Sequence, residues 1–170
     1  TLFPYTTLFR SVVATGTAVA TDEIYINDSN ADYSLTSAPQ IDARAFVNNG
    51  NFVVLTAPLL FDTQNTLYVT NNGTMSGSVG FQFDLATSLG ARKSAAQFVN
   101  LRRGVIEALE YYYVYASNTM YFPTFITVSA TNIVNEGLLR VGNSGLLRLE
   151  GKNIDLTRGG LEVGTLEPSI

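Results

Sequence analysis

"NIVNEGLLRVGNSGLLRLEGKNIDLTRGGLEVG", residues 132–164, is the stretch that decides the fold class. Its apolar residues alternate with charged ones in short pieces, such as Leu139-Arg140-Val141, and glycine separates the pieces. A period of two residues is that of a β-strand with one buried face. Gly137 and Gly160 lie 23 positions apart, which is close to one coil of three such strands. Pieces this short suit a solenoid better than a sandwich, whose strands usually run about 5–6 residues.

A second pattern places Asn and Gly two positions apart between apolar residues. It occurs as "FVNNGNF" (46–52), "VTNNGTM" (69–75), "IVNEGLL" (133–139) and "VGNSGLL" (141–147), and "FVNLRRGVI" (98–106) is the same unit with two extra residues. Successive Asn residues are 23, 29, 35 and 8 positions apart. A recurring unit that cannot bury its own apolar face is typical of a solenoid. We predict a structural ladder of turn residues, which consists of Asn48, Gly50, Asn71, Gly73, Asn100, Asn135, Gly137, Asn143 and Gly145.

An Asn that is followed by Gly has two structural uses, because Asn bonds to its own backbone and Gly adopts positive φ without steric cost. One use is a two-residue hairpin turn, at Asn49-Gly50 and Asn72-Gly73. The other is a corner of a parallel solenoid, where stacked Asn side chains hydrogen-bond along the axis. We favour an all-β, right-handed parallel β-solenoid (β-helix), with an antiparallel β-sandwich or jelly roll as the alternative. Residues 91–110 also have helix-like composition, and there we favour a coil with an irregular corner.

The composition excludes several classes of function. Only 14% of the 170 residues are charged, and the net charge of -4 provides no basic surface for nucleic acid. The chain has neither His nor Cys, which excludes disulfides, Ser-His-Asp and Cys-His catalysis, and most zinc sites. No apolar run approaches the roughly 18 residues of a membrane-spanning helix. We expect no cofactor, no nucleic-acid partner and no membrane insertion within this chain.

Residues 1–11, "TLFPYTTLFRS", differ from everything that follows them. One choice of codons for this segment reproduces a widely used short-read sequencing adapter. We therefore expect a non-native segment that lies as a loose tail or poorly packed strand outside the coil stack. Residues 12–170 are predicted to form a single solenoid domain that is truncated at both ends.

The segment "GLLRLEGKNIDLTRGGLEVG" (145–164) resembles the repeats of filamentous-haemagglutinin-type and autotransporter-type bacterial surface proteins. Those repeats combine apolar-x-apolar pieces with an Asn-Ile-x-Asn unit and a Gly-Gly pair. Here Asp155 stands where the second Asn is usual. The similarity covers residues 130–164 and, more loosely, residues 45–85. It implies a secreted or surface-displayed right-handed β-helix that serves in adhesion or as a stalk, without a catalytic site.

Two groups of side chains are candidates for binding or catalysis. Tyr111, Tyr113 and Tyr115 would share one face of a strand, from which flat aromatic rings could contact carbohydrate. The carboxylates are single and mostly alternate with apolar residues, which is typical of the solvent face of strands, so we predict no catalytic residue. These carboxylates are Asp42, Asp62, Asp84, Glu136, Glu150, Asp155 and Glu162.

A weak calcium candidate lies near the beginning of the chain. Asp28, Asn30 and Asp32 have the oxygen-ligand spacing of the first half of a calcium-binding loop. Tyr33 and Pro39 stand where that loop requires Gly and Glu, so a solvated turn is the better interpretation. We therefore predict no metal site.

These observations favour a structural or adhesive, non-catalytic segment of a secreted or cell-surface bacterial repeat protein. Its expected partners are host or matrix glycans or other surface proteins. One alternative is a β-helical carbohydrate-active enzyme or a tail-spike-like domain, which requires two or three carboxylates that converge on one face of stacked coils. Another is an antiparallel carbohydrate-binding module that uses the Tyr111–Tyr115 row, and parallel strand pairing would exclude it.

Overall fold

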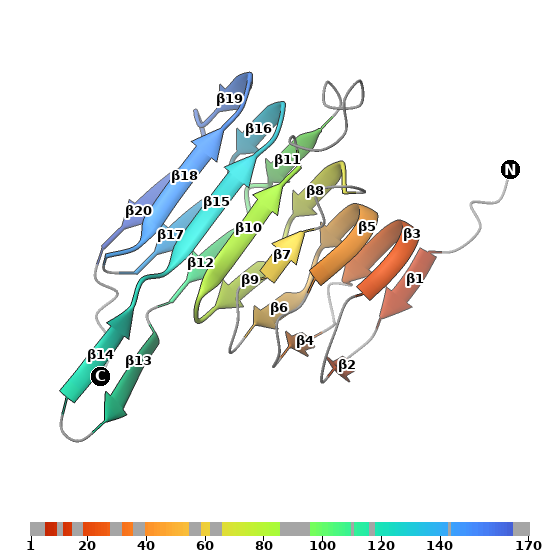
Figure 1. Ribbon diagram of the computed structural model, residues 1–170. Coiled ribbons are helices and arrows are strands. Elements are labelled where there is room, and N and C mark those ends of the chain that lie inside the picture. Colours follow the sequence, from red (N-terminus) through yellow and green to blue (C-terminus); the bar gives the residue numbers. More distant parts are fainter. Residues whose placement is uncertain are drawn as a thin grey trace, which may run out of the picture.

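Short strands that meet at tight corners make up the regular structure of this chain (Figure 1). The computed structural model describes residues 6–9, 12–14, 19–27, 32–35, 40–54, 59–61, 66–85, 96–109, 111–115, 118–142 and 144–164; for residues 111–122 and most of those before Ala43 it describes the backbone alone. Every regular element in these ranges is a strand. The same ranges contain no helix that is long and apolar enough to cross a membrane.

The strands stack in three columns of parallel neighbours. Column I contains β7 (Leu59–Phe61), β10 (Gly80–Asp84), β15 (Phe125–Ser129) and β18 (Leu146–Glu150). Column II contains β1 (Thr6–Phe9), β8 (Tyr68–Asn71), β11 (Gln97–Asn100), β16 (Asn132–Asn135) and β19 (Asn153–Asp155). Column III contains β2 (Val12–Ala14), β4 (Asp32–Leu35), β6 (Asn51–Val54), β9 (Thr74–Gly77), β12 (Val105–Ala108), β17 (Leu138–Val141) and β20 (Gly160–Val163). The long strands β3 (Val19–Asn27) and β5 (Gln40–Asn48) extend through columns I and II and join them into one sheet.

The chain visits the three columns in turn and then begins the next coil. Strands β15, β16 and β17 form one coil, and β18, β19 and β20 form the next one beside it (Figure 1). Phe125 pairs with Leu146, and Leu138 pairs with Gly160, so one uninterrupted coil takes 21 or 22 residues. This arrangement confirms the predicted parallel solenoid.

Two alternatives to the solenoid are wrong. Among the described strands, every pairing is parallel except the one between β13 (Tyr111–Tyr115) and β14 (Asn118–Phe122), so the fold is neither a sandwich nor an antiparallel binding module. The Asn49-Gly50 corner is not a hairpin, because β5 pairs with β8 and β6 pairs with β9, each within its own column. The same separation of columns applies at Asn72-Gly73.

Insertions at two corners explain the longest spacing of the sequence pattern, the 35 positions between Asn100 and Asn135. The β13–β14 hairpin is inserted between β12 of column III and β15 of column I, and it projects away from the stack at this corner (Figure 1). Two residues, Arg102 and Arg103, lengthen the corner between β11 and β12 as turn residues. The predicted irregular coil is therefore confirmed for the described part of residues 91–110.

One continuous apolar core fills the interior of the stack. Phe61 and Phe83 stack with ring centroids 4.6 Å apart, and Phe83 meets Phe98 edge to face at 4.9 Å. Gly77 leaves room for this cluster, because a Cβ there would lie 3.1 Å from Cε2 of Phe81. Full burial of one such aromatic side chain stabilises the fold by roughly 1.5–3 kcal/mol. The buried aromatic residues are Phe46, Phe52, Phe61, Phe81, Phe83 and Phe98.

The opening segment contributes a strand to the stack. Residues Thr6–Phe9 form β1, which pairs in parallel with β3 from Thr6 opposite Ile24 to Phe9 opposite Asn27. The prediction that these residues lie outside the coil stack is therefore wrong. The open edge of a parallel sheet can pair with any extended segment through backbone hydrogen bonds, whatever the origin of that segment. The pairing of β1 therefore does not test the adapter interpretation, which stays a prediction.

Candidate functional site

A ladder of buried asparagine side chains runs along the corner between columns II and III. Each member ends its column II strand and is at most 1% exposed. The Nδ2 group of each Asn donates to Oδ1 of the Asn in the next coil. The bonds run from Asn27 to Asn48 (2.7 Å), to Asn71 (2.8 Å), to Asn100 (2.9 Å) and to Asn135 (2.8 Å). The predicted stacking of Asn48, Asn71, Asn100 and Asn135 is confirmed.

Each ladder amide also makes a hydrogen bond to the backbone of a neighbouring coil. Asn48 Nδ2 donates to the carbonyl of Thr74 at 3.2 Å, and Asn100 Nδ2 donates to that of Leu138 at 3.3 Å. The carboxamide therefore uses both N–H groups and joins column II of one coil to column III of the next. An amide that lost these partners would cost about 1–3 kcal/mol in this buried position. The ladder thus specifies how the coils align.

Close packing, and not backbone conformation, explains the glycines of this corner. A Cβ on Gly73 would lie 2.1 Å from the carbonyl oxygen of Gly50, and a Cβ on Gly137 would lie 2.1 Å from that of Gly104. Those carbonyls accept hydrogen bonds from the next coil, with Leu138 N donating to Gly104 O at 2.9 Å. The prediction that these glycines adopt positive φ is wrong. Among the described residues, positive φ occurs at Gly80, Gly164 and Ser144.

The ladder includes residues that the sequence pattern missed. Asn27 begins it, although no Gly lies two positions later; the shorter signal apolar-x-Asn would have found it. Gly50, Gly73, Gly104 and Gly137 form a glycine column at this corner. Gly104 was missed, and its Cβ would lie 2.1 Å from Oδ1 of Asn100. At the other end, Asp155 pairs with Val134, so Leu156, and not Asp155, follows Asn135 in the ladder position.

Of the predicted ladder residues, Gly145 belongs to a different part of the coil. Gly145 lies at the corner between columns III and I, where its N–H donates to the carbonyl of Gly142 at 3.0 Å. Asn143 lies outside the described residues. Thr124, which precedes β15 in the neighbouring coil, lies at the same corner. Its Oγ1 accepts a hydrogen bond from Gly142 N at 3.2 Å.

The outward side chains of column I form a polar patch around a shallow hollow of about 260 Å³. Asp84, Ser129 and Glu150 are aligned across three adjacent strands. The strand spacing puts the Cα atoms of Asp84 and Glu150 about 10 Å apart. Glu150 pairs with Arg148, whereas Oδ1 of Asp84 is buried without a hydrogen-bond partner. This column I patch consists of Gln82, Asp84, Thr127, Ser129, Arg148 and Glu150.

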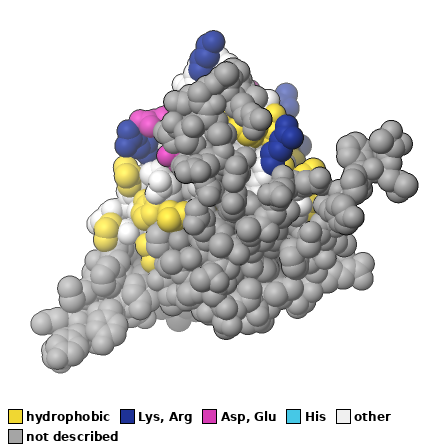
Figure 2. Space-filling model, turned by 45° about the vertical axis from the view of Figure 1, so that its right-hand side comes forward, with side chains coloured by type: hydrophobic (Ala, Val, Ile, Leu, Met, Phe, Trp, Pro, Cys, Tyr) yellow, Lys and Arg dark blue, Asp and Glu magenta, His cyan; other side chains and the backbone are white. Residues whose placement is uncertain are grey.

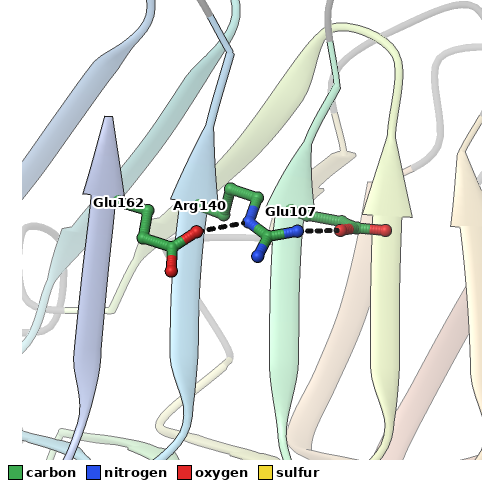
Figure 3. Close-up of polar contacts among 3 residues, drawn as sticks. All are labelled: Glu107, Arg140 and Glu162. Carbon is green, nitrogen blue, oxygen red and sulfur yellow. Dashed lines mark hydrogen bonds and ion pairs between the residues drawn. The ribbon is translucent and has the colours of Figure 1, made fainter. Parts of the chain in front are cut away.

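Carboxylates on the other faces pair with arginine. On column III, Arg140 lies between Glu107, at 3.8 Å, and Glu162, at 2.7 Å, each on a neighbouring strand (Figure 3). Arg158 lies 3.5 Å from Glu136 near the ladder corner. Figure 2 likewise shows acidic side chains beside basic ones on the face in view. In the described part of the chain, no group of three or more Asp or Glu residues is placed to hold a metal ion.

Asp155 is a fixed acceptor on the exposed face of the last coil. Its Oδ1 accepts hydrogen bonds from the backbone N–H of Thr157 at 3.0 Å and from the Thr157 hydroxyl at 2.8 Å. The backbone bond, the hydroxyl bond and the charge of Arg158 together hold the pKa of Asp155 below its ordinary value of 3.8. These bonds fix the side chain of Asp155 at the end of β19.

The remaining candidate residues are placed only in part. Tyr111, Tyr113 and Tyr115 occupy alternate positions of β13, opposite Phe122, Met120 and Asn118 of β14. Asp28 and Asn30 lie outside the described residues, and Asp32 begins β4. The calcium and carbohydrate candidates therefore stay predictions.

Comparison with known proteins gives no match: no family model, no curated protein and no solved structure is similar to this chain. The β-solenoid repeat architecture rests on the strand register, the asparagine ladder and the aromatic stack. The resemblance to haemagglutinin-type repeats stays a prediction.

Proposed function

We propose that this chain is a structural or adhesive segment of a secreted or cell-surface bacterial protein, and that it is not an enzyme. The observation that supports this most is the unbroken asparagine ladder, which extends over five coils beside a continuous core. Stacked coils that are joined in this way make a stiff rod, because each coil is held by side-chain and backbone bonds to its neighbours. A rod suits a stalk that presents other surfaces at a distance.

The β13–β14 hairpin is the proposed adhesive element. It leaves the stack at a corner that the preceding coil crosses with just Ser78 and Val79. Aromatic residues fill most of β13, and such residues provide large contact areas for glycans or protein surfaces at little cost in conformational entropy. Host or matrix glycans and other surface proteins are therefore the proposed partners.

Deletion of residues 110–123 tests the role of the hairpin. The deletion joins Leu109 to Thr124, which then occupy the places of Ser78 and Val79 in the preceding coil. We expect the shortened chain to keep its thermal unfolding midpoint and to lose binding to an array of mammalian and matrix glycans. A full-length control with Tyr111→Ser, Tyr113→Ser and Tyr115→Ser should lose the same binding. A deleted chain that binds as well as the parent would contradict the proposed adhesive element.

One observation favours the enzymatic alternative, namely the alignment of Asp84 and Glu150 in the column I patch. Glycosidases use two carboxyl groups roughly 5–9.5 Å apart, one of which must be free to act as an acid or a nucleophile. Here Arg148 forms an ion pair with Glu150. Asp84 and Glu150 also lie on β10 and β18, which are separated by β15.

Release of reducing sugar from a panel of plant, algal and bacterial polysaccharides tests this alternative. We expect the purified chain to release no more sugar than a sample without protein. Cleavage that Asp84→Asn abolishes, while Asp155→Asn leaves it intact, would show that the column I patch is an active site and would overturn the proposal.

A further inference from the structure

The first member of the asparagine ladder has a buried acceptor without a donor. Asn27 is 0% exposed, and its Oδ1 makes no hydrogen bond. In each later member the same atom accepts from the Nδ2 group of the preceding coil. A buried amide oxygen without a partner costs about 1–3 kcal/mol, so the corner at Asn27 is incomplete on the side that faces the preceding strand.

The strand register identifies the position from which the donor is missing. Phe9 pairs with Asn27 in the parallel ladder of β1 and β3, as Asn27 pairs with Asn48 and Asn48 pairs with Asn71. Position 9 is therefore the ladder position of the first coil. Phenylalanine has no side-chain donor, so it cannot complete the bond whatever its rotamer.

A second position of β1 also departs from the pattern of the stack. Thr7 pairs with Tyr25, in the row that faces the core in later coils. The residues that follow in this row are apolar or aromatic, whereas Thr7 carries a hydroxyl and is smaller than the Phe residues of the later coils. The residues that follow Thr7 are Tyr25, Phe46, Val69, Phe98 and Ile133.

From these positions we propose that the face of the coil that carries Asn27 is an interaction surface for a further β-coil whose ladder residue is asparagine. Residues Thr6–Phe9 pair with this surface as a parallel strand, but Phe9 supplies no side-chain donor to Asn27. The occupant that fits presents an Nδ2 donor opposite Asn27 and a large apolar residue opposite Tyr25. This inference does not depend on the proposed stalk or adhesive function.

Thermal unfolding of the full chain with Phe9→Asn and with Phe9→Leu tests the proposal. Both variants lose the aromatic ring, and Asn and Leu are similar in size, so the difference between them isolates the amide donor. We expect the Phe9→Asn midpoint to be higher by about 2–4 °C, which corresponds to one added buried hydrogen bond in a chain of this length. In an Asn27→Leu background, which removes the acceptor, the Phe9→Asn chain should have no advantage over the Phe9→Leu chain.

Two results would overturn the proposal. One is a Phe9→Leu chain at least as stable as the Phe9→Asn chain, which would mean that the acceptor of Asn27 needs no amide from position 9. The other is an advantage of Phe9→Asn that persists in the Asn27→Leu background, which would mean that the gain arises elsewhere. The first comparison stands by itself if Asn27→Leu prevents folding.

Discussion

Two neighbouring coils share one sequence pattern and one register but differ in burial. In the inner coil, β15–β17, Leu139 and Val141 are 0% exposed, whereas their partners in the last described coil, Leu161 and Val163, are 44% and 61% exposed. The alternation of apolar and charged residues is the same in both. The difference shows that a coil does not bury its own apolar face; the coils on either side bury it. Equivalent substitutions in the two coils should therefore have unequal effects.

The largest difference is expected at the glycine column. In Gly137→Ala the new Cβ would meet the backbone oxygen of Gly104 at 2.1 Å, and a main-chain atom that pairs with the next coil cannot move aside. We expect a loss of more than about 4 kcal/mol in the free energy of unfolding, or no folded protein. Gly160→Ala is the control for a glycine outside this column, because Gly160 pairs with Leu138 and its Cβ would meet the flexible Cδ1 of that residue at 3.1 Å. Urea titration that finds equal losses would refute the close-packing explanation.

Apolar truncation comes next in size. Ile133 and Ile154 are the same residue type in register, but they are 1% and 42% exposed. Ile133→Ala leaves a cavity in the core and should cost about 2–5 kcal/mol, whereas Ile154→Ala should cost less than about 1 kcal/mol. Chemical denaturation of both variants measures the contrast. Similar losses would mean that another part of the protein covers the last coil.

Loss of one ladder amide should have an intermediate effect. Asn100→Ala removes the donor to Asn135 Oδ1 and one of the acceptors of Asn71 Nδ2, which leaves the buried Asn135 oxygen unpaired and the ladder interrupted. We expect a loss of about 2–4 kcal/mol in the free energy of unfolding. Asn153 is the control, because it also donates to an Asn of the adjacent coil, Asn132 at 2.8 Å, but on an exposed face, so Asn153→Ala should cost under about 1 kcal/mol. If thermal melts rank the two variants in the opposite order, the ladder does not hold the coils together.

The smallest effect concerns the exposed end of the last coil. The pKa of Asp155 is lowered in the folded state, so its contribution to stability is present above its ordinary pKa of 3.8 and is lost as the pH falls through the lower folded value. We expect Asp155→Asn to differ from the parent above pH 4 and to converge with it in stronger acid. An NMR titration of the Asp155 carboxyl carbon measures the pKa directly. A midpoint above 3.8 would show that the Thr157 bonds do not form in solution.

Local patterns were sufficient to predict the fold and most of the ladder. Asn48, Asn71, Asn100 and Asn135 were predictable because the turn chemistry and the apolar periodicity agree at each of them. Asn27 was missed because its corner lacks the glycine that completes the pattern. The reason for the glycines was predicted incorrectly, since the contact of Gly137 with Gly104 joins residues of different coils and appears only when the coils stack.

Contacts between coils were the other features that the sequence could not predict. The row of Glu107, Arg140 and Glu162 requires one shared register across three strands. The spacing between such residues depends on the inserted hairpin, whose length no periodicity sets. The β13–β14 pairing was likewise not predicted, because a tyrosine-rich run is compatible with a strand of the stack as well as with a separate hairpin.

The parallel register of stacked coils is the central claim, and disulfide trapping tests it most directly. The chain has no cysteine, so an introduced pair reports on one contact without background. Val99 and Val134 are register partners on β11 and β16, at the neighbour spacing of about 4.8 Å, which lies within the range a disulfide spans. Val99 and Asp155 are two strands apart in the same row, at about 10 Å, which is too far for a disulfide. We predict that Val99→Cys with Val134→Cys crosslinks within the monomer under mild oxidation and that Val99→Cys with Asp155→Cys does not; the reverse result would contradict the stacked-coil register.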